Sequence, residues 1–133
     1  MEMTKEQEEQ ARKQFEENIK NVDESDVEYA SKKGQSKINK IGDNPPNALL
    51  KLWEDVKLMV GLITDYLRGN YKEVPWNVIA SIAAAIVYFV SPVDIIPDFI
   101  PALGYADDAA VLRLALSFAG PDLEKYKQWK DSK

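Results

Sequence analysis

Carboxylates are the only concentration of chemically capable side chains in the most apolar part of this chain. The only acidic residues between positions 75 and 120 are Asp94, Asp98, Asp107 and Asp108. If the stretch that carries them folds back on itself, several carboxylates converge, and their mutual repulsion favours a hard cation with oxygen ligands. The spacing is not that of an EF-hand, but it permits a Mg²⁺ or Ca²⁺ site with a regulatory or hydrolytic role.

The same aspartates have a second interpretation, in which they satisfy the backbone at helix ends. Asp94 and Asp98 are placed to cap two short helical turns. Asp107 and Asp108 fall where the free N–H groups of a following helix favour carboxylates, and one of them can pair with Arg113. This interpretation accounts for every aspartate without a ligand. The sequence therefore permits two roles for the aspartates, a metal site and helix capping.

Three prolines make the stretch a stiff, bent connection. Pro92, Pro97 and Pro101 each fix φ, remove a backbone donor and push the preceding residue out of the helical region. Ser91 before Pro92 is typical of an N-cap followed by the first helical position, and Gly104 can adopt the positive φ that ends a turn. We therefore predict a rigid turn rather than a continuous helix.

The residues of this turn also form an ordered motif: Tyr88, then Ser91-Pro92-x-Asp94-x-Ile96-Pro97-Asp98-x-Ile100-Pro101-x-x-Gly104-Tyr105-x-Asp107-Asp108. The motif resembles the signature of the YkvA-like family, domain of unknown function 1232. The resemblance extends over roughly residues 49–116. It implies a small helical domain, sometimes attached to membrane segments, and it brings no established biochemical activity with it.

The turn joins two apolar segments that we predict to be helices. Residues 78–90 are apolar apart from Ser81, and residues 109–119 carry Arg113 as their only charge. A helix over the first segment is about 21–24 Å long, short of the roughly 30 Å hydrocarbon core of a bilayer. Many alanines in both segments favour close packing as an antiparallel hairpin, wrapped either by protein or, as a re-entrant hairpin, by lipid.

A second helix is predicted over residues 47–67, because apolar side chains recur there at helical spacing. The polar side chains, Asp65 among them, fall on the opposite face. Gly69 can end this helix in a left-handed conformation. Gly120 followed by Pro121 predicts a further break, after which Leu123, Tyr126 and Trp129 would mark a short closing helix.

The N-terminal third is more polar. Residues 4–22 show one thin apolar stripe, and Asp23 to Asp26 is typical of a break followed by a new helix N-cap. The segment 42–46 holds a glycine and two prolines and is the best candidate boundary. We predict two parts, a polar helical N-terminal arm over 1–45, either mobile or partner-binding, and a YkvA-like domain over 46–133.

Composition excludes several functions. The 133-residue chain has no cysteine or histidine, which excludes thiol and imidazole catalysis and ordinary zinc sites. Its net charge of −5 argues against nucleic acid as a partner. No nucleophile motif or phosphate-cradling glycine loop is present. The N-terminus lacks the apolar core of a signal peptide, so we expect a cytoplasmic protein.

These observations predict an all-α fold: a small helical bundle built on an antiparallel hairpin with a Pro/Asp-rich turn, preceded by a helical arm. The expected function is that of a non-enzymatic module that binds a protein partner or the cytoplasmic membrane surface, peripherally or through a re-entrant hairpin. The alternative is the carboxylate site for Mg²⁺ or Ca²⁺. The pattern does not indicate an oligomeric state.

Overall fold

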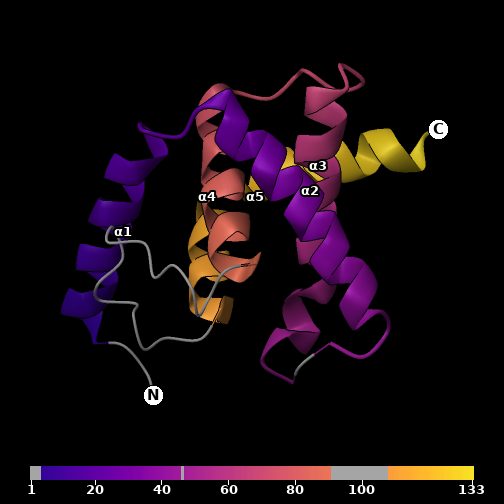
Figure 1. Cartoon of the computed structure of the whole chain (residues 1–133). Helices are drawn as coiled ribbons and strands as arrows, with labels where there is room; N and C mark the ends of the chain where they lie inside the picture. Colours follow the sequence, from indigo (N-terminus) through magenta and orange to yellow (C-terminus); the bar gives the residue numbers. More distant parts are fainter. Residues whose placement is uncertain (1–3, 46, 91–107) are drawn as a thin grey trace.

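The computed structural model describes residues 4–45, 47–90 and 108–133 (Figure 1). These residues form α-helices and one 3₁₀ helix, with no strand among them, so the predicted all-α fold is confirmed. The elements in chain order are α1 (Lys5–Ile19), α2 (Glu24–Ile41), η1 (Asn47–Leu52), α3 (Trp53–Leu67), α4 (Trp76–Val90) and α5 (Asp108–Asp131).

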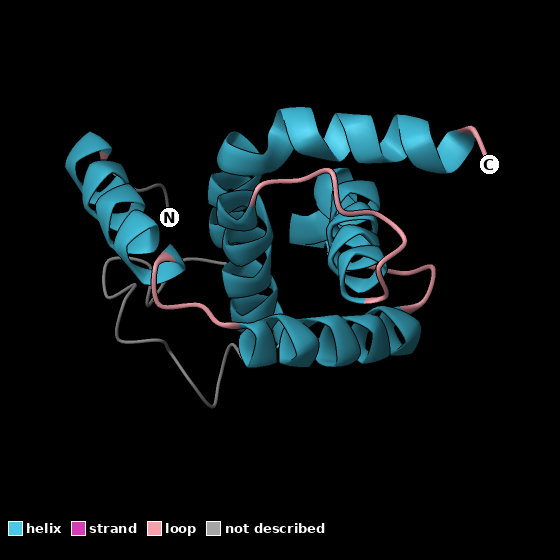
Figure 2. Cartoon of the chain, turned by 90° about the horizontal axis from the view of Figure 1, so that it is seen from above, coloured by secondary structure: helices cyan, strands magenta, loops and turns pink. Residues whose placement is uncertain are grey.

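The helix α4 is the centre of the molecule. It packs against α1, α2, α3 and α5, so protein surrounds its apolar side chains (Figures 1 and 2). Ile79, Ile82, Ile86 and Phe89 are completely buried, and even Ser81 has no exposed surface. The Ser81 hydroxyl donates to the carbonyl of Val78 at 2.8 Å, which satisfies this buried polar group within the helix. The other helices of the protein therefore cover the apolar surface of α4, which could otherwise be covered only by lipid.

The predicted antiparallel hairpin is present. The first half of α5 runs alongside α4 in the opposite direction (Figure 1), and the two helices are in contact. Small side chains lie in the core on both helices, at Ala83 and Ala84 on α4 and at Ala115 and Ala119 on α5. Their size allows the two backbones to approach closely.

The predicted break at Gly120 and Pro121 is wrong. The helix α5 continues through Pro121 to Asp131, so there is no separate closing helix. The helix bends instead: its second half turns away from α4 and passes behind α3 in Figure 1. Pro121 removes the bond to the carbonyl four residues earlier, which permits the bend, and Gly120 has no Cβ to clash with the proline ring.

The N-terminal helices contribute to the same core as the rest of the chain. Val27, Ala30 and Ile38 of α2 are buried, and α2 contacts both α3 and α4. From α1, Phe15 is completely buried, and its ring stacks on that of Phe118 at 5.8 Å between centroids. The arm predicted for residues 1–45 is thus packed on the bundle along α1 and α2.

The predicted N-cap of α2 is confirmed. The Asp23 carboxylate accepts a bond from the backbone N–H of Asp26, and the Asp26 carboxylate accepts one from the N–H of Asp23, each at 3.0 Å. This reciprocal pair is a capping box. Hydrogen bonds from the Ser25 hydroxyl and the Asp26 backbone lower the pKa of Asp23 below its ordinary value. Gly69 has a φ of +79°, as predicted for the end of α3.

A glycine permits α2 to approach the core. A Cβ at Gly34 would lie 2.9 Å from a methyl group of Ile86 on α4 and 2.9 Å from one of Val60 on α3. Both neighbours are branched and completely buried, so neither can move away easily. Gly34 therefore sets the distance between α2 and the hairpin.

We expect Gly34→Ala to destabilise the protein. The overpacking costs about 1–3 kcal/mol, which exceeds the roughly 1 kcal/mol gained by replacing a helical glycine. Ser36→Ala is the matched control, because Ser36 is exposed on the same helix. Chemical denaturation of both variants measures the difference. A Gly34→Ala protein more stable than the parent would contradict this account of the packing.

Candidate functional site

Most of the predicted site residues lie outside the part that the structure describes. These are the aspartates Asp94, Asp98 and Asp107 and the turn residues Ser91, Pro92, Pro97, Pro101 and Gly104. Asp108 is the first residue of α5, where a helix start was predicted, and Arg113 is exposed one turn later. Within the described ranges, no three acidic residues converge in a way that suits a metal ion. The metal site, the caps and the ion pair of Arg113 stay predictions.

The structure does show what holds the end of α4, the helix that precedes the turn residues in the chain. The helix α4 ends at Val90, and the Lys37 ammonium on α2 donates to the carbonyl of Phe89 at 2.5 Å. The same ammonium lies 4.5 Å from the centre of the Phe89 ring. A cation at this place satisfies a free carbonyl and complements the negative end of the helix. A residue far from the turn in sequence thus fixes the helix from which the turn departs.

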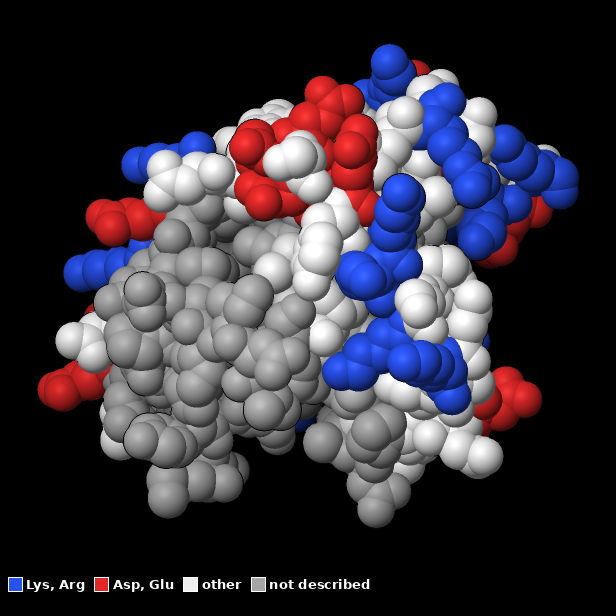
Figure 3. All heavy atoms as spheres, viewed as in Figure 1, with Lys and Arg blue, Asp and Glu red and all other residues white. Residues whose placement is uncertain are grey.

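Charges are segregated along α2. Its acids Glu24, Asp26 and Glu28 all precede Tyr29, and residues 29–42 contain lysines but no acid. In Figure 3 acidic side chains gather near the start of this helix and basic ones over its continuation toward the lower right. Among the residues that the structure describes, those on α2 beside the end of α4 are therefore basic.

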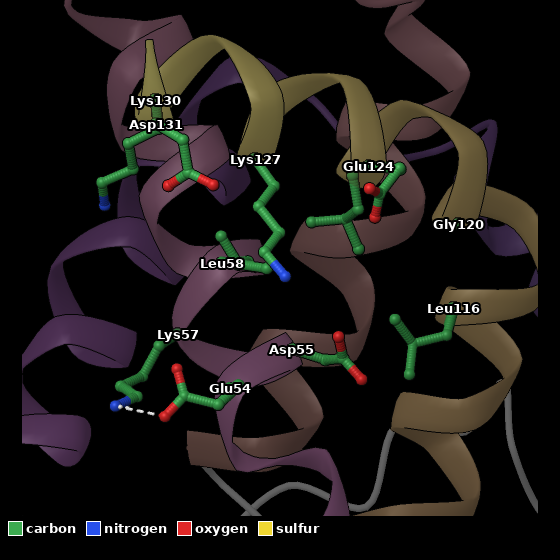
Figure 4. A pocket seen from close by; sticks show the side chains of 11 residues that line it. Glu54, Asp55, Lys57, Leu58, Leu116, Gly120, Glu124, Lys127, Lys130 and Asp131 are labelled. Carbon is green, nitrogen blue, oxygen red and sulfur yellow. Dashed lines mark ion pairs between the residues drawn. The ribbon is translucent and has the colours of Figure 1, made fainter. Parts of the chain in front are cut away.

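The bend of α5 leaves a groove of about 470 Å³ between α5 and α3. Leucines from both helices line it together with carboxylates and lysines, and Lys127 extends from α5 into it (Figure 4). Lys57 and Glu54 on its rim form an ion pair at 3.0 Å, and both side chains are largely exposed. Such a pair contributes little to stability. The lining holds no hydroxyl or thiol side chain, and its charged and apolar groups give the groove a mixed surface.

Asp65, which the sequence predicts on the polar face of its helix, lies at the contact between α3 and α5. Its side chain is half-buried and accepts a hydrogen bond from the Tyr126 hydroxyl at 2.5 Å. Tyr126 is completely buried, and its hydroxyl fills the space where Gly61 lacks a side chain. The ring contacts those of Tyr71 and Trp129. This cluster attaches the second half of α5 to α3, and burial, followed by the Asp65 carboxylate, raises the pKa of Tyr126.

Sequence reasoning did not find Lys37, Asp65 or Tyr126 as interacting residues. A buried tyrosine needs a partner for its hydroxyl, so the apolar stripe that includes Tyr126 signalled that a polar group must lie nearby. Nothing in the spacing identified Asp65, which is 61 residues away in the chain.

Comparisons with known proteins find the same family that the motif in the turn suggests. Residues 78–114 match the model of the family described as "Protein of unknown function (DUF1232)". The match spans α4, the Pro/Asp-rich turn and the start of α5. This segment belongs to the YkvA-like family. The resemblance seen in the sequence is thereby confirmed.

A relative supports the same assignment. A stretch of 69 residues is 39% identical to the "Uncharacterized membrane protein YkvA" of Bacillus subtilis (strain 168). The aligned stretch covers 52% of this chain and 65% of that protein, just under two thirds of the relative's length. No solved structure matches the chain. The family assignment therefore comes without a known activity.

We expect the hydrogen bond between Tyr126 and Asp65 to be visible in the pH dependence of stability. Because the pKa of Tyr126 is raised in the folded protein above the ordinary value of 10.0, the folded state keeps a proton that the unfolded chain releases. The stabilisation is complete below about pH 10 and declines as the pH rises further. The raised pKa of Tyr71, caused by burial and then by Glu73 and Asp122, acts in the same direction.

Tyr126→Phe should lower the unfolding free energy at neutral pH by about 1–3 kcal/mol, because a half-buried carboxylate loses its donor. Its alkaline decline should also be shallower than that of the parent. Tyr66→Phe is the control, since Tyr66 neighbours Asp65 on α3 but takes no part in this bond. Urea denaturation at several pH values measures both effects. Equal stability and an equal decline in Tyr126→Phe would refute the role of this bond.

Proposed function

We propose that this protein is a non-enzymatic helical module that associates peripherally with the cytoplasmic membrane surface. The observation that carries the proposal is the burial of α4. The most apolar helix of the chain is enclosed by four other helices, so it gains nothing from lipid that protein does not already provide. Any association with a membrane must then use the outside of the bundle.

The relative from Bacillus subtilis supports the choice of a membrane over other surfaces, because its name describes it as a membrane protein. Among the described residues, no helix is both long enough and apolar enough to cross a bilayer. A bundle whose apolar helix is enclosed and whose relative is a membrane protein fits peripheral contact better than insertion.

The exposed apolar side chains argue for electrostatic rather than hydrophobic contact. In the described part of the chain, the large exposed ones are Tyr29 on α2, Leu50 on η1 and Trp76 on α4. They belong to three different elements, and single exposed apolar residues are normal on soluble proteins. Charged side chains must therefore provide most of the attraction to lipid headgroups.

We expect the full chain to co-sediment with vesicles that contain phosphatidylglycerol and to remain in solution with pure phosphatidylcholine. Binding should fall steeply as salt is raised to about 0.15 M, where the screening length is about 8 Å. A pelleting assay over a salt series measures this. Failure to pellet with any vesicle would reject the membrane proposal and leave a protein partner as the function to test.

A further inference from the structure

One side of α2 presents lysines to solvent. Lys33, Lys37 and Lys40 recur at spacings of four and three, which places them on one stripe, and Lys32 lies beside it. Lys32, Lys33 and Lys40 are exposed. The core side of the same helix is a separate stripe of Ala30, Gly34, Ile38 and Ile41. Because that stripe is packed on α3 and α4, the lysines cannot rotate inward.

The helix dipole explains only part of this arrangement. Basic residues stabilise the last turn of a helix, which accounts for Lys40, and the bond to Phe89 accounts for Lys37. Lys32 and Lys33 lie in the middle of α2, where the dipole has little effect. No described carboxylate forms an ion pair with either of them. Their charges are therefore available to an external anion.

We infer that Lys32, Lys33, Lys37 and Lys40, here called the basic face, form the surface of this protein that contacts anionic lipid headgroups. The inference rests on the proposed function and identifies where and with what chemistry it operates. Lysine ammonium groups attract the phosphates of an anionic membrane surface without requiring a fixed geometry. The basic face suits such contact because its lysines are close together and no acid lies between them in residues 32–40.

The location of the basic face connects it to the family segment. Lys37 contacts the last turn of α4, directly before the Pro/Asp-rich turn begins. The helix that carries the basic face lies outside residues 78–114, the part matched by the family model. Docking through α2 would bring the end of α4 to the membrane surface while the apolar hairpin stays enclosed in protein.

Lipid is a better occupant than nucleic acid. The chain as a whole carries a net charge of −5, so its overall field repels a long polyanion. A membrane contacts only one side of the protein, and acids on other sides are screened beyond about 8 Å at physiological salt. A local group of lysines can therefore bind a flat anionic surface despite the negative total.

The test compares two triple variants of the full chain with the same change in charge. The first is Lys32→Ala, Lys33→Ala and Lys40→Ala, which leaves Lys37 to hold α4. The second, a control, is Lys125→Ala, Lys127→Ala and Lys130→Ala in the second half of α5, where Asp122, Glu124 and Asp131 lie among the lysines. Alanine favours helix at all six positions, and circular dichroism checks that both variants fold.

Each lysine near an anionic surface contributes about fivefold to binding, so the α2 variant should bind phosphatidylglycerol vesicles about 100-fold more weakly than the parent. The α5 variant should stay within about threefold of the parent, because its lysines are balanced by neighbouring acids.

The outcomes separate the two proposals. If the parent binds and the α2 variant binds equally well, or the α5 variant loses as much, the basic face is not the contact surface but the membrane function stands. If the parent binds no vesicle, the proposed function fails. If the parent binds a DNA duplex and no vesicle, and the α2 variant loses the DNA, both proposals give way to a nucleic-acid function.

Discussion

The enclosure of α4 is the constraint on which the rest of this structure depends. A helix that is apolar on every side cannot remain in water, and each fully buried Ile or Phe contributes about 1.5–3 kcal/mol relative to exposure. One partner helix can cover only one side. The chain therefore supplies four, since α1, α2, α3 and α5 all pack against α4. The polar N-terminal helices are needed because without them apolar surface of α4 would face solvent.

The other specific contacts maintain this enclosure. Gly34 lets α2 approach both α3 and α4, and Lys37 satisfies a carbonyl at the end of α4. The bend at Pro121 directs the second half of α5 away from α4, and the bond between Tyr126 and Asp65 attaches that half to α3. Apart from the bend, each of these contacts joins segments that are distant in sequence. Together they leave the outer side of α2 as a basic surface beside the end of α4.

Much of the fold could be predicted from local patterns. The apolar run of α4, the stripe of α3, the N-cap at Asp23 and the left-handed Gly69 all follow from nearby residues, and the structure contains them. Long-range contacts could not be predicted: the partners of Lys37 and Asp65 depend on how the helices cross. The break predicted at Pro121 was wrong because a proline can bend a helix without ending it when glycine precedes it. The roles predicted for the four aspartates, metal binding or helix capping, stay predictions, since three of these residues lie outside the described residues.

Native-state amide hydrogen exchange on the full chain, with and without phosphatidylglycerol vesicles, tests the enclosure of α4 most directly. Amides that open only on global unfolding exchange slowest. The account predicts that residues 79–86 are among the slowest in the protein and that vesicles do not accelerate them. Faster exchange in these residues than in α1, or acceleration on adding vesicles, would show that α4 leaves its protein surroundings and would contradict the account.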